Sequence, residues 1–121
     1  KVLNLIIEKT NPVIICSSDW KYYFNLNQLN DILKINGVNG EIIDITPSLW
    51  GIKYKNLFEL ENCRADEIKT FAEKNKIANF VAVDDLNLYK WLPNNFVWCS
   101  NEKEGIKQSG IKEKIIKILE K

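Results

Sequence analysis

Residues 79–88 read "NFVAVDDLNL", an apolar run that stops at two adjacent carboxylates, Asp84 and Asp85. A short run of this kind is typical of a strand that is covered on both faces within a parallel sheet. Two like charges at the end of such a strand repel each other unless a cation or a proton holds them together. The stretch therefore predicts a buried strand with a candidate cation site at its carboxyl end.

Similar signals alternate between strand and helix along the whole chain. Short apolar runs predict further strands, and amphipathic spacing predicts helices between them. The expected strands are residues 13–16, 41–45, 79–83 and 95–99, the expected helices are residues 1–10, 25–37, 64–77 and 110–121, and residues 47–63 are expected to form an ordered loop or flap. This alternation predicts an α/β fold that is Rossmann-like, with three α/β/α layers and a mostly parallel sheet.

Length and charge limit the possible functions. The 121 residues are enough for one domain with a real core, which we expect to span residues 1–121. A formal net charge of +1 gives no global field that would draw the protein to nucleic acid or anionic lipid. No apolar run is long enough for a membrane span, so we expect a cytoplasmic protein without membrane contact. The sequence does not indicate an oligomeric state.

The side chains available for chemistry are of few kinds. Histidine is absent, which excludes imidazole as a base, an acid or a metal ligand. The three cysteines form no C-x-x-C pair and are expected to be packing residues. Arg64 is the only arginine beside sixteen lysines, and its guanidinium offers a fixed fork of donors that lysine lacks. Oxygen ligands and a hard cation are therefore the natural chemistry of this chain.

Polar residues follow the predicted strands directly, where the ligands of open α/β sheets bind. Ser17 and Ser18 follow the first strand, Asp84 and Asp85 end the third, and Arg64 begins the helix before it. A hydroxyl and a cation stabilise phosphoryl oxygens, and two carboxylates suit an octahedral Mg²⁺ ion. The residues after the strands therefore predict a site for a phosphoryl group and Mg²⁺.

The order of these motifs resembles the haloacid dehalogenase superfamily. "VIICSS" at residues 13–18 is similar to its second motif, an apolar strand that ends in Ser or Thr, and "VAVDD" at residues 81–85 is similar to its fourth. Arg64 stands twenty residues before Asp84, where the third motif has its Lys or Arg. The resemblance implies that Ser17 and Arg64 contact a transferring phosphoryl group and that the two acids hold Mg²⁺.

A closer resemblance is to the haloacid dehalogenase-like domain of multidomain RNA-repair proteins. "IICSSDWK", "RADEIKTFAEKN" and "FVAVDDL" follow the order and spacing of that branch, and the resemblance covers nearly the whole chain. The branch typically has a Ser-Ser-Ser-Trp-Arg stretch, so Asp19 and Lys21 depart from it. The departure argues against carrying a family role over to Lys21.

The first motif of the superfamily, a strand that ends in Asp-x-Asp or Asp-x-Thr, is not among these residues. "DIT" at residues 44–46 superficially resembles it, but it follows the second motif instead of preceding it. Enzymes of the superfamily use the first Asp of this motif as a nucleophile that forms an aspartyl-phosphate. We therefore expect that the chain is N-terminally incomplete and that the nucleophile strand lies upstream of Lys1.

Two functions are compatible with these expectations. The resemblance implies a Mg²⁺-dependent phosphohydrolase that acts on a small phosphorylated substrate or a phosphorylated nucleic-acid end. The alternative is a non-catalytic domain that keeps the fold and serves binding or scaffolding in a larger protein. Structural alternatives for the site residues are a Ser17 hydroxyl bonded to neighbouring backbone and a local ion pair of Arg64 with Asp66 or Glu67.

Overall fold

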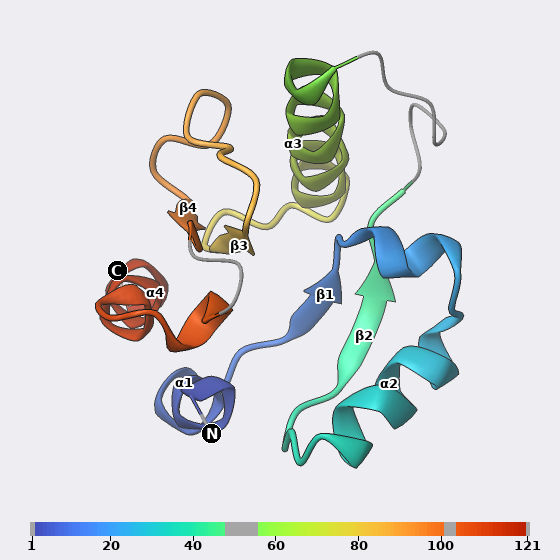
Figure 1. The fold of residues 1–121 in the computed structure, drawn as a ribbon, viewed down its shortest axis with the longest axis vertical. Coiled ribbons are helices and arrows are strands. Elements are labelled where there is room, and N and C mark those ends of the chain that lie inside the picture. Colours follow the sequence, from blue (N-terminus) through green and yellow to red (C-terminus); the bar gives the residue numbers. More distant parts are fainter. Residues whose placement is uncertain (1, 48–55, 101–103, 121) are drawn as a thin grey trace. The chain divides into compact units, whose positions relative to one another are not determined.

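The structure is a computed structural model that describes residues 2–47, 56–100 and 104–120 (Figure 1). It divides into two compact units, residues 1–46 and residues 47–121. Helices and short strands alternate in both units, and both strand pairs that the structure describes are parallel. These features agree with the predicted α/β fold.

The first unit is built around one parallel strand pair. Its elements are α1 (Val2–Thr10), β1 (Ile14–Cys16), the 3-10 helix η1 (Asp19–Tyr22), α2 (Leu26–Ile35) and β2 (Ile42–Ile45). Helix α2 begins with a capping box, in which the side chains of Asn25 and Gln28 each accept a hydrogen bond from the backbone N–H of the other. Because β1 and β2 are parallel and Cys16 lies beside Ile45, both strands end at the same edge.

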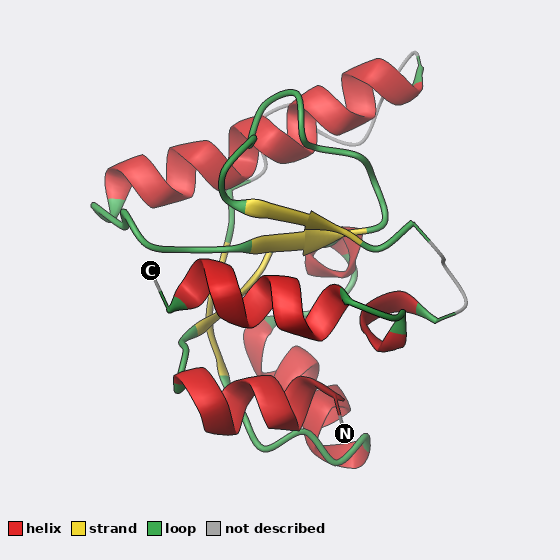
Figure 2. Cartoon of the chain, turned by 90° about the vertical axis from the view of Figure 1, so that its left-hand side faces the viewer, coloured by secondary structure: helices red, strands yellow, loops and turns green. Residues whose placement is uncertain are grey.

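The second unit contains another parallel strand pair between two helices. Its elements are α3 (Leu57–Lys74), β3 (Ala82–Asp84), β4 (Phe96–Trp98), the 3-10 helix η2 (Gly105–Lys107) and α4 (Ile111–Leu119). In the pair, Ala82 lies beside Phe96 and Asp84 lies beside Trp98. Figure 2 shows the two strands side by side, with α3 on one side of them and α4 on the other.

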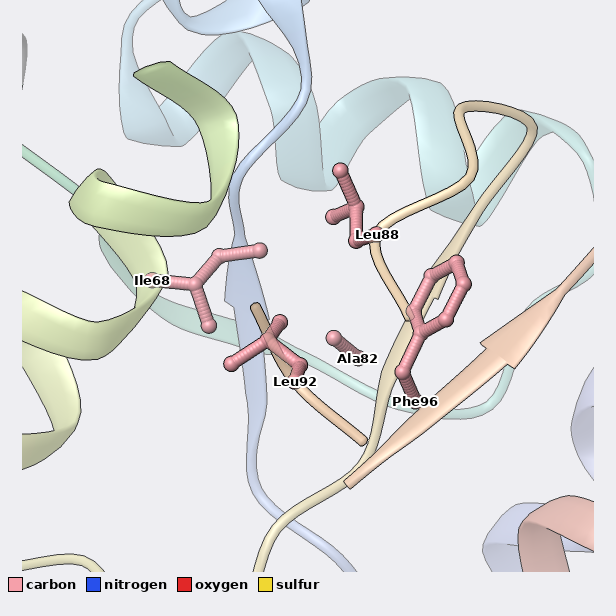
Figure 3. Packing of buried hydrophobic residues seen from close by; sticks show 5 residues of the cluster. All are labelled: Ile68, Ala82, Leu88, Leu92 and Phe96. Carbon is pink, nitrogen blue, oxygen red and sulfur yellow. The ribbon is translucent and has the colours of Figure 1, made fainter. Parts of the chain in front are cut away.

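The core of the second unit lies on the α3 side of the strand pair. Because side chains alternate along a strand and Ala82 is paired with Phe96, both point to the same face, and Ile68 of α3 belongs to the same cluster (Figure 3). Leu88 and Leu92 come from the crossover loop between β3 and β4 and complete the cluster. Leu88 is fully buried, so this loop is anchored in the core.

Helix α4 packs on β4 on the opposite side. Val97 follows Phe96 and therefore points away from α3, and it is 1% exposed. Ile111 and Ile115 are the buried residues of α4, and their spacing of four places them on one face of the helix. The amphipathic pattern predicted for this helix is thus confirmed.

The prediction of a loop over residues 47–63 is wrong for the second half of this range, because α3 already begins at Leu57. Most of its first half lies outside the described residues. The Asn56 side chain accepts a hydrogen bond from the backbone N–H of Glu59 and caps the helix. Leu57 and Phe58 are 61% and 50% exposed, so the first turn has no inward apolar stripe that would reveal its helical period.

The remaining expected elements are present with boundaries that differ by a few residues. Within the described ranges, none of the helices has the length and apolar character needed to cross a membrane.

Candidate functional site

The candidate site is centred on an ion pair between α3 and the end of β3. Arg64 Nη1 donates to Asp84 Oδ2 at 2.5 Å, and the two residues are 20 positions apart in the sequence. Asp84 comes two residues after Ala82, so its side chain points to the α3 face of the strand pair. The two side chains are 8% and 7% exposed. The spacing noted in the sequence therefore corresponds to a direct contact between two largely buried charges.

A second donor holds the other oxygen of the Asp84 carboxylate. The backbone N–H of Leu86 donates to Asp84 Oδ1 at 3.1 Å, a local turn that aspartate side chains commonly stabilise. The backbone of Asp84 still belongs to the sheet, because its carbonyl accepts a hydrogen bond from the N–H of Cys99 at 2.8 Å. The orientation of this carboxylate is therefore set by both the helix and the loop.

Burial dominates the electrostatics of Asp84. Loss of solvation raises the pKa of this carboxyl from 3.8 to about 6, although the Arg64 guanidinium and the Leu86 N–H oppose the rise. A side-chain hydrogen bond with Asp85 and the charge of Asp85 raise the pKa as well. The folded state binds this proton more tightly than the unfolded chain, so the stability that the proton contributes is lost as the pH rises from 3.8 through about 6.

The apparent pKa of Asp84 is expected to fall when Asp85 is replaced by Asn. The amide keeps the size of the side chain but removes a negative charge that disfavours a second carboxylate beside it. Carbon-13 NMR titration of the Asp84 carboxyl carbon measures the shift. Asp31→Asn, which changes an exposed acid of α2, serves as the control. An Asp84 pKa that does not move in Asp85→Asn would mean that the two carboxyls are not coupled.

Asp85 supplies an exposed carboxylate next to the buried one. Its backbone carbonyl accepts a hydrogen bond from Trp98 Nε1 at 2.8 Å, which ties the first residue of the crossover loop to β4. No cluster of three or more acidic, cysteine or histidine side chains is placed to hold a metal in the part of the chain that the structure describes. Mg²⁺ often takes only one or two protein carboxylates and completes its shell with water and phosphate, so this donor pair fits such an ion.

Ser17 belongs to the first unit, where it directly follows β1. Among the described residues, its hydroxyl takes part in no hydrogen bond. It is half-buried, so a ligand at the strand end has access to it. The structure thus brings Arg64, Asp84 and Asp85 together in one unit and places Ser17 at a strand end of the other.

Lys21 and Thr46 also meet at the strand ends of the first unit, although neither is among the predicted site residues. Lys21 Nζ donates to Thr46 Oγ1 at 2.9 Å, across 25 positions of sequence. Thr46 directly follows β2 just as Ser17 follows β1, so the rule that located Ser17 applies to Thr46 as well. Lys21 has no such signal, because only the folded chain brings it to the end of β2.

A groove of about 480 Å³ lies elsewhere in the second unit, between the C-terminal half of α3 and the crossover loop. Lys76, Phe80 and Trp91 are among the residues that line it, and none of the candidate site residues does. The candidate chemistry therefore lies at the strand ends and is separate from this groove.

The described residues thus contain parallel strand pairs, a serine after one strand and a buried guanidinium–carboxylate pair at the end of another. A family model described as the HAD domain in Swiss Army Knife RNA repair proteins matches residues 1–110, and the chain belongs to this family. The match confirms the resemblance predicted from the motifs. Comparison with curated proteins and with solved structures finds no match.

Proposed function

We propose that this domain is a Mg²⁺-dependent phosphohydrolase of the haloacid dehalogenase type. The observation that carries the proposal is the cluster at the end of β3, where Arg64 contacts Asp84 and Asp85 lies beside it, in a chain of that family. The proposed substrate is a small phosphorylated molecule or a phosphorylated nucleic-acid end. The RNA-repair description of the family supports the second of these.

Asp84 and Asp85 are the proposed metal ligands. Arg64 and the Leu86 N–H orient Asp84, whereas Asp85 is exposed to solvent, so the pair combines a positioned carboxylate with an accessible one. Both offer the hard oxygen ligands that Mg²⁺ prefers. The bound ion would neutralise the charge that develops on the phosphoryl oxygens.

Ser17 and Arg64 are the proposed contacts to the phosphoryl group. The Ser17 hydroxyl can donate its hydrogen to a phosphoryl oxygen, and the absence of a hydrogen bond to it within the described residues supports this role. Arg64 Nη1 contacts Asp84, so its positive charge lies at the end of β3 beside the proposed metal ligands. Its charge would stabilise the phosphoryl oxygens while it keeps Asp84 in place.

The proposed nucleophile is an aspartate at the end of a further strand, as in enzymes of the superfamily. The Asp at the end of that strand would attack phosphorus and expel the leaving-group oxygen, which takes up a proton. Water would then hydrolyse the aspartyl-phosphate and release phosphate.

Removal of the metal tests this proposal in the complete protein that contains this chain. Hydrolysis of p-nitrophenyl phosphate is expected to require Mg²⁺ and to fall by at least about 100-fold when EDTA is present. Added Mg²⁺ should restore the rate. Ca²⁺ should not, because it favours larger and less regular coordination. Equal rates with and without chelator would overturn the proposal, and Mg²⁺ binding without any hydrolysis would favour the non-catalytic alternative.

A further inference from the structure

We infer that the Trp98 ring stacks on the nucleobase of a phosphorylated nucleic-acid end. The inference rests on the proposed function and selects the second of its two substrate classes. It is carried by the position of Trp98 beside the proposed metal ligands, by the hydrogen bond that fixes its indole, and by the exposed aromatic surface of its ring.

Strand pairing places Trp98 next to the candidate site, within the second unit. Trp98 is the last residue of β4 and the register partner of Asp84, the last residue of β3. Figure 2 shows these two strands side by side. Because paired residues of adjacent strands point to the same face, the indole leaves the sheet on the same face as the Asp84 carboxylate. The ring therefore lies at the strand ends, where the ligands of open α/β sheets bind.

A hydrogen bond to the crossover loop fixes the orientation of the indole. Trp98 Nε1 donates to the Asp85 carbonyl at 2.8 Å. A tryptophan side chain has only two torsions, so this bond and the strand backbone leave the ring little freedom. A ring that is already fixed loses little conformational entropy when a ligand stacks on it. Trp98 is thus a preorganised surface attached to the residue that also carries the exposed carboxylate of the site.

The aromatic surface of Trp98 is exposed and has no aromatic or cationic partner in the described part of the chain. Trp98 is 38% exposed, and its ring takes part in no ring pair and no cation–π contact there. Trp91 differs, because its ring centroid lies 5.4 Å from that of Phe58 and 5.8 Å from Lys90 Nζ. Since the single polar atom of the Trp98 indole is already bonded, the ring offers a ligand its π surface.

A nucleobase is the ligand group that suits this surface. Every base has a flat π face, and stacking on an aromatic side chain requires no hydrogen bond from that side chain. A phosphoryl group held by Mg²⁺ at Asp84 and Asp85 brings its leaving group to the same strand ends, beside the Trp98 ring. The base of a nucleotide would cover the ring, whereas an aliphatic phosphate would leave it exposed. The observations therefore favour a nucleotide as the substrate end.

Matched substrates test the inference on the complete Mg²⁺-loaded protein. Adenosine monophosphate and ribose phosphate, with the phosphate on the same sugar carbon, differ only by the base. The wild type is expected to hydrolyse the nucleotide with the higher kcat/KM, and Trp98→Leu should reduce this preference by about tenfold or more. Isothermal titration calorimetry with adenosine monophosphate should show a similar loss of affinity.

Two further variants serve as controls for the aromatic ring. Trp98→Phe should keep most of the preference, because it retains a π face, even where loss of the bond to Asp85 lowers both rates. Trp91→Leu is the same substitution at the groove that is separate from the candidate site, and it should keep the wild-type preference. The preference is the deciding quantity, because a purely structural effect of Trp98 would lower the rates with both substrates alike.

The outcomes separate this inference from the proposed function. If Trp98→Leu hydrolyses both substrates with the wild-type preference, or if the wild type has no preference, the base contact is overturned and the proposed function stands. An equal loss of preference in Trp91→Leu would also overturn the contact. If Trp98→Leu fails to fold, quenching of tryptophan fluorescence by adenosine monophosphate that persists in full in Trp98→Phe decides against the contact.

The binding measurement covers the opposite case. A wild type that binds adenosine monophosphate through Trp98 but hydrolyses no phosphate ester would remove the proposed hydrolysis and leave the base contact in place. A wild type that neither binds the nucleotide nor hydrolyses any phosphate ester would remove both proposals.

Discussion

Replacement of Asp84 by Asn in the complete protein is expected to lower kcat/KM for an aryl phosphate by at least about 100-fold. The amide has nearly the shape of the carboxylate, and its oxygen can still accept a hydrogen bond from Arg64 or from the Leu86 N–H. It carries no charge, so it is a poor ligand for a hard cation and no longer balances the guanidinium. A Mg²⁺ titration of the rate should show a higher half-saturating concentration in the variant.

Glu113→Gln is the matched control for this experiment. The Glu113 side chain is 67% exposed on α4 and pairs with Lys112 at the surface, so its charge lies outside the candidate site. This variant should keep the wild-type rate. An Asp84→Asn rate within about twofold of the wild type would contradict the metal role of Asp84. A large loss of rate with an unchanged Mg²⁺ half-saturation would instead assign Asp84 to the positioning of Arg64.

Replacement of Arg64 by Met is expected to lower the free energy of unfolding by about 3–5 kcal/mol near pH 8, because it leaves a buried carboxylate without its cation. The double variant Arg64→Met/Asp84→Leu should recover most of this loss, since two apolar side chains leave no charge to bury. The cost of Arg64→Met should be smaller below the Asp84 pKa of about 6, where the carboxyl is neutral. Urea unfolding at two pH values measures these differences.

Lys112→Met provides the comparison with a surface ion pair. Lys112 Nζ and Glu113 Oε2 are 3.6 Å apart, and the two side chains are 38% and 67% exposed. Solvent screens such a pair, so its loss should cost less than about 1 kcal/mol. If Lys112→Met and Arg64→Met lowered the free energy of unfolding by similar amounts, burial could not be the reason why the Arg64–Asp84 pair stabilises the fold. Strictly additive effects of Arg64→Met and Asp84→Leu would show that Arg64 and Asp84 do not stabilise each other.

The elements that can be predicted from the sequence are those whose pattern is local. The apolar run before Asp84 identifies β3, and the spacing of Ile111 and Ile115 identifies α4, because the period of each element appears in consecutive residues. The start of α3 escapes this reasoning, since Leu57 and Phe58 are exposed and hide the helical period. Only the cap at Asn56, with Glu59 three residues later, marks this start in the sequence.

For the candidate site, residue types and motif order identify Arg64, Asp84 and Asp85 without any coordinates. These features do not settle which acid Arg64 contacts, because Asp66 and Glu67 are nearer to it in the sequence. The parallel register of β3 and its position beside α3 settle the contact in favour of Asp84. The register turns the Asp84 side chain toward α3. Because both side chains are buried, removal of either charge leaves the other without its partner.

The sequence by itself determined the family, the alternation of strands and helices, and the polar residues that follow the strands. Only the tertiary structure decided that Lys21 reaches Thr46 and that Arg64 reaches Asp84. The physical reason is that periodicity and capping act over a few neighbouring residues. A contact across 20 or 25 positions depends instead on how strands pair and how helices pack against them.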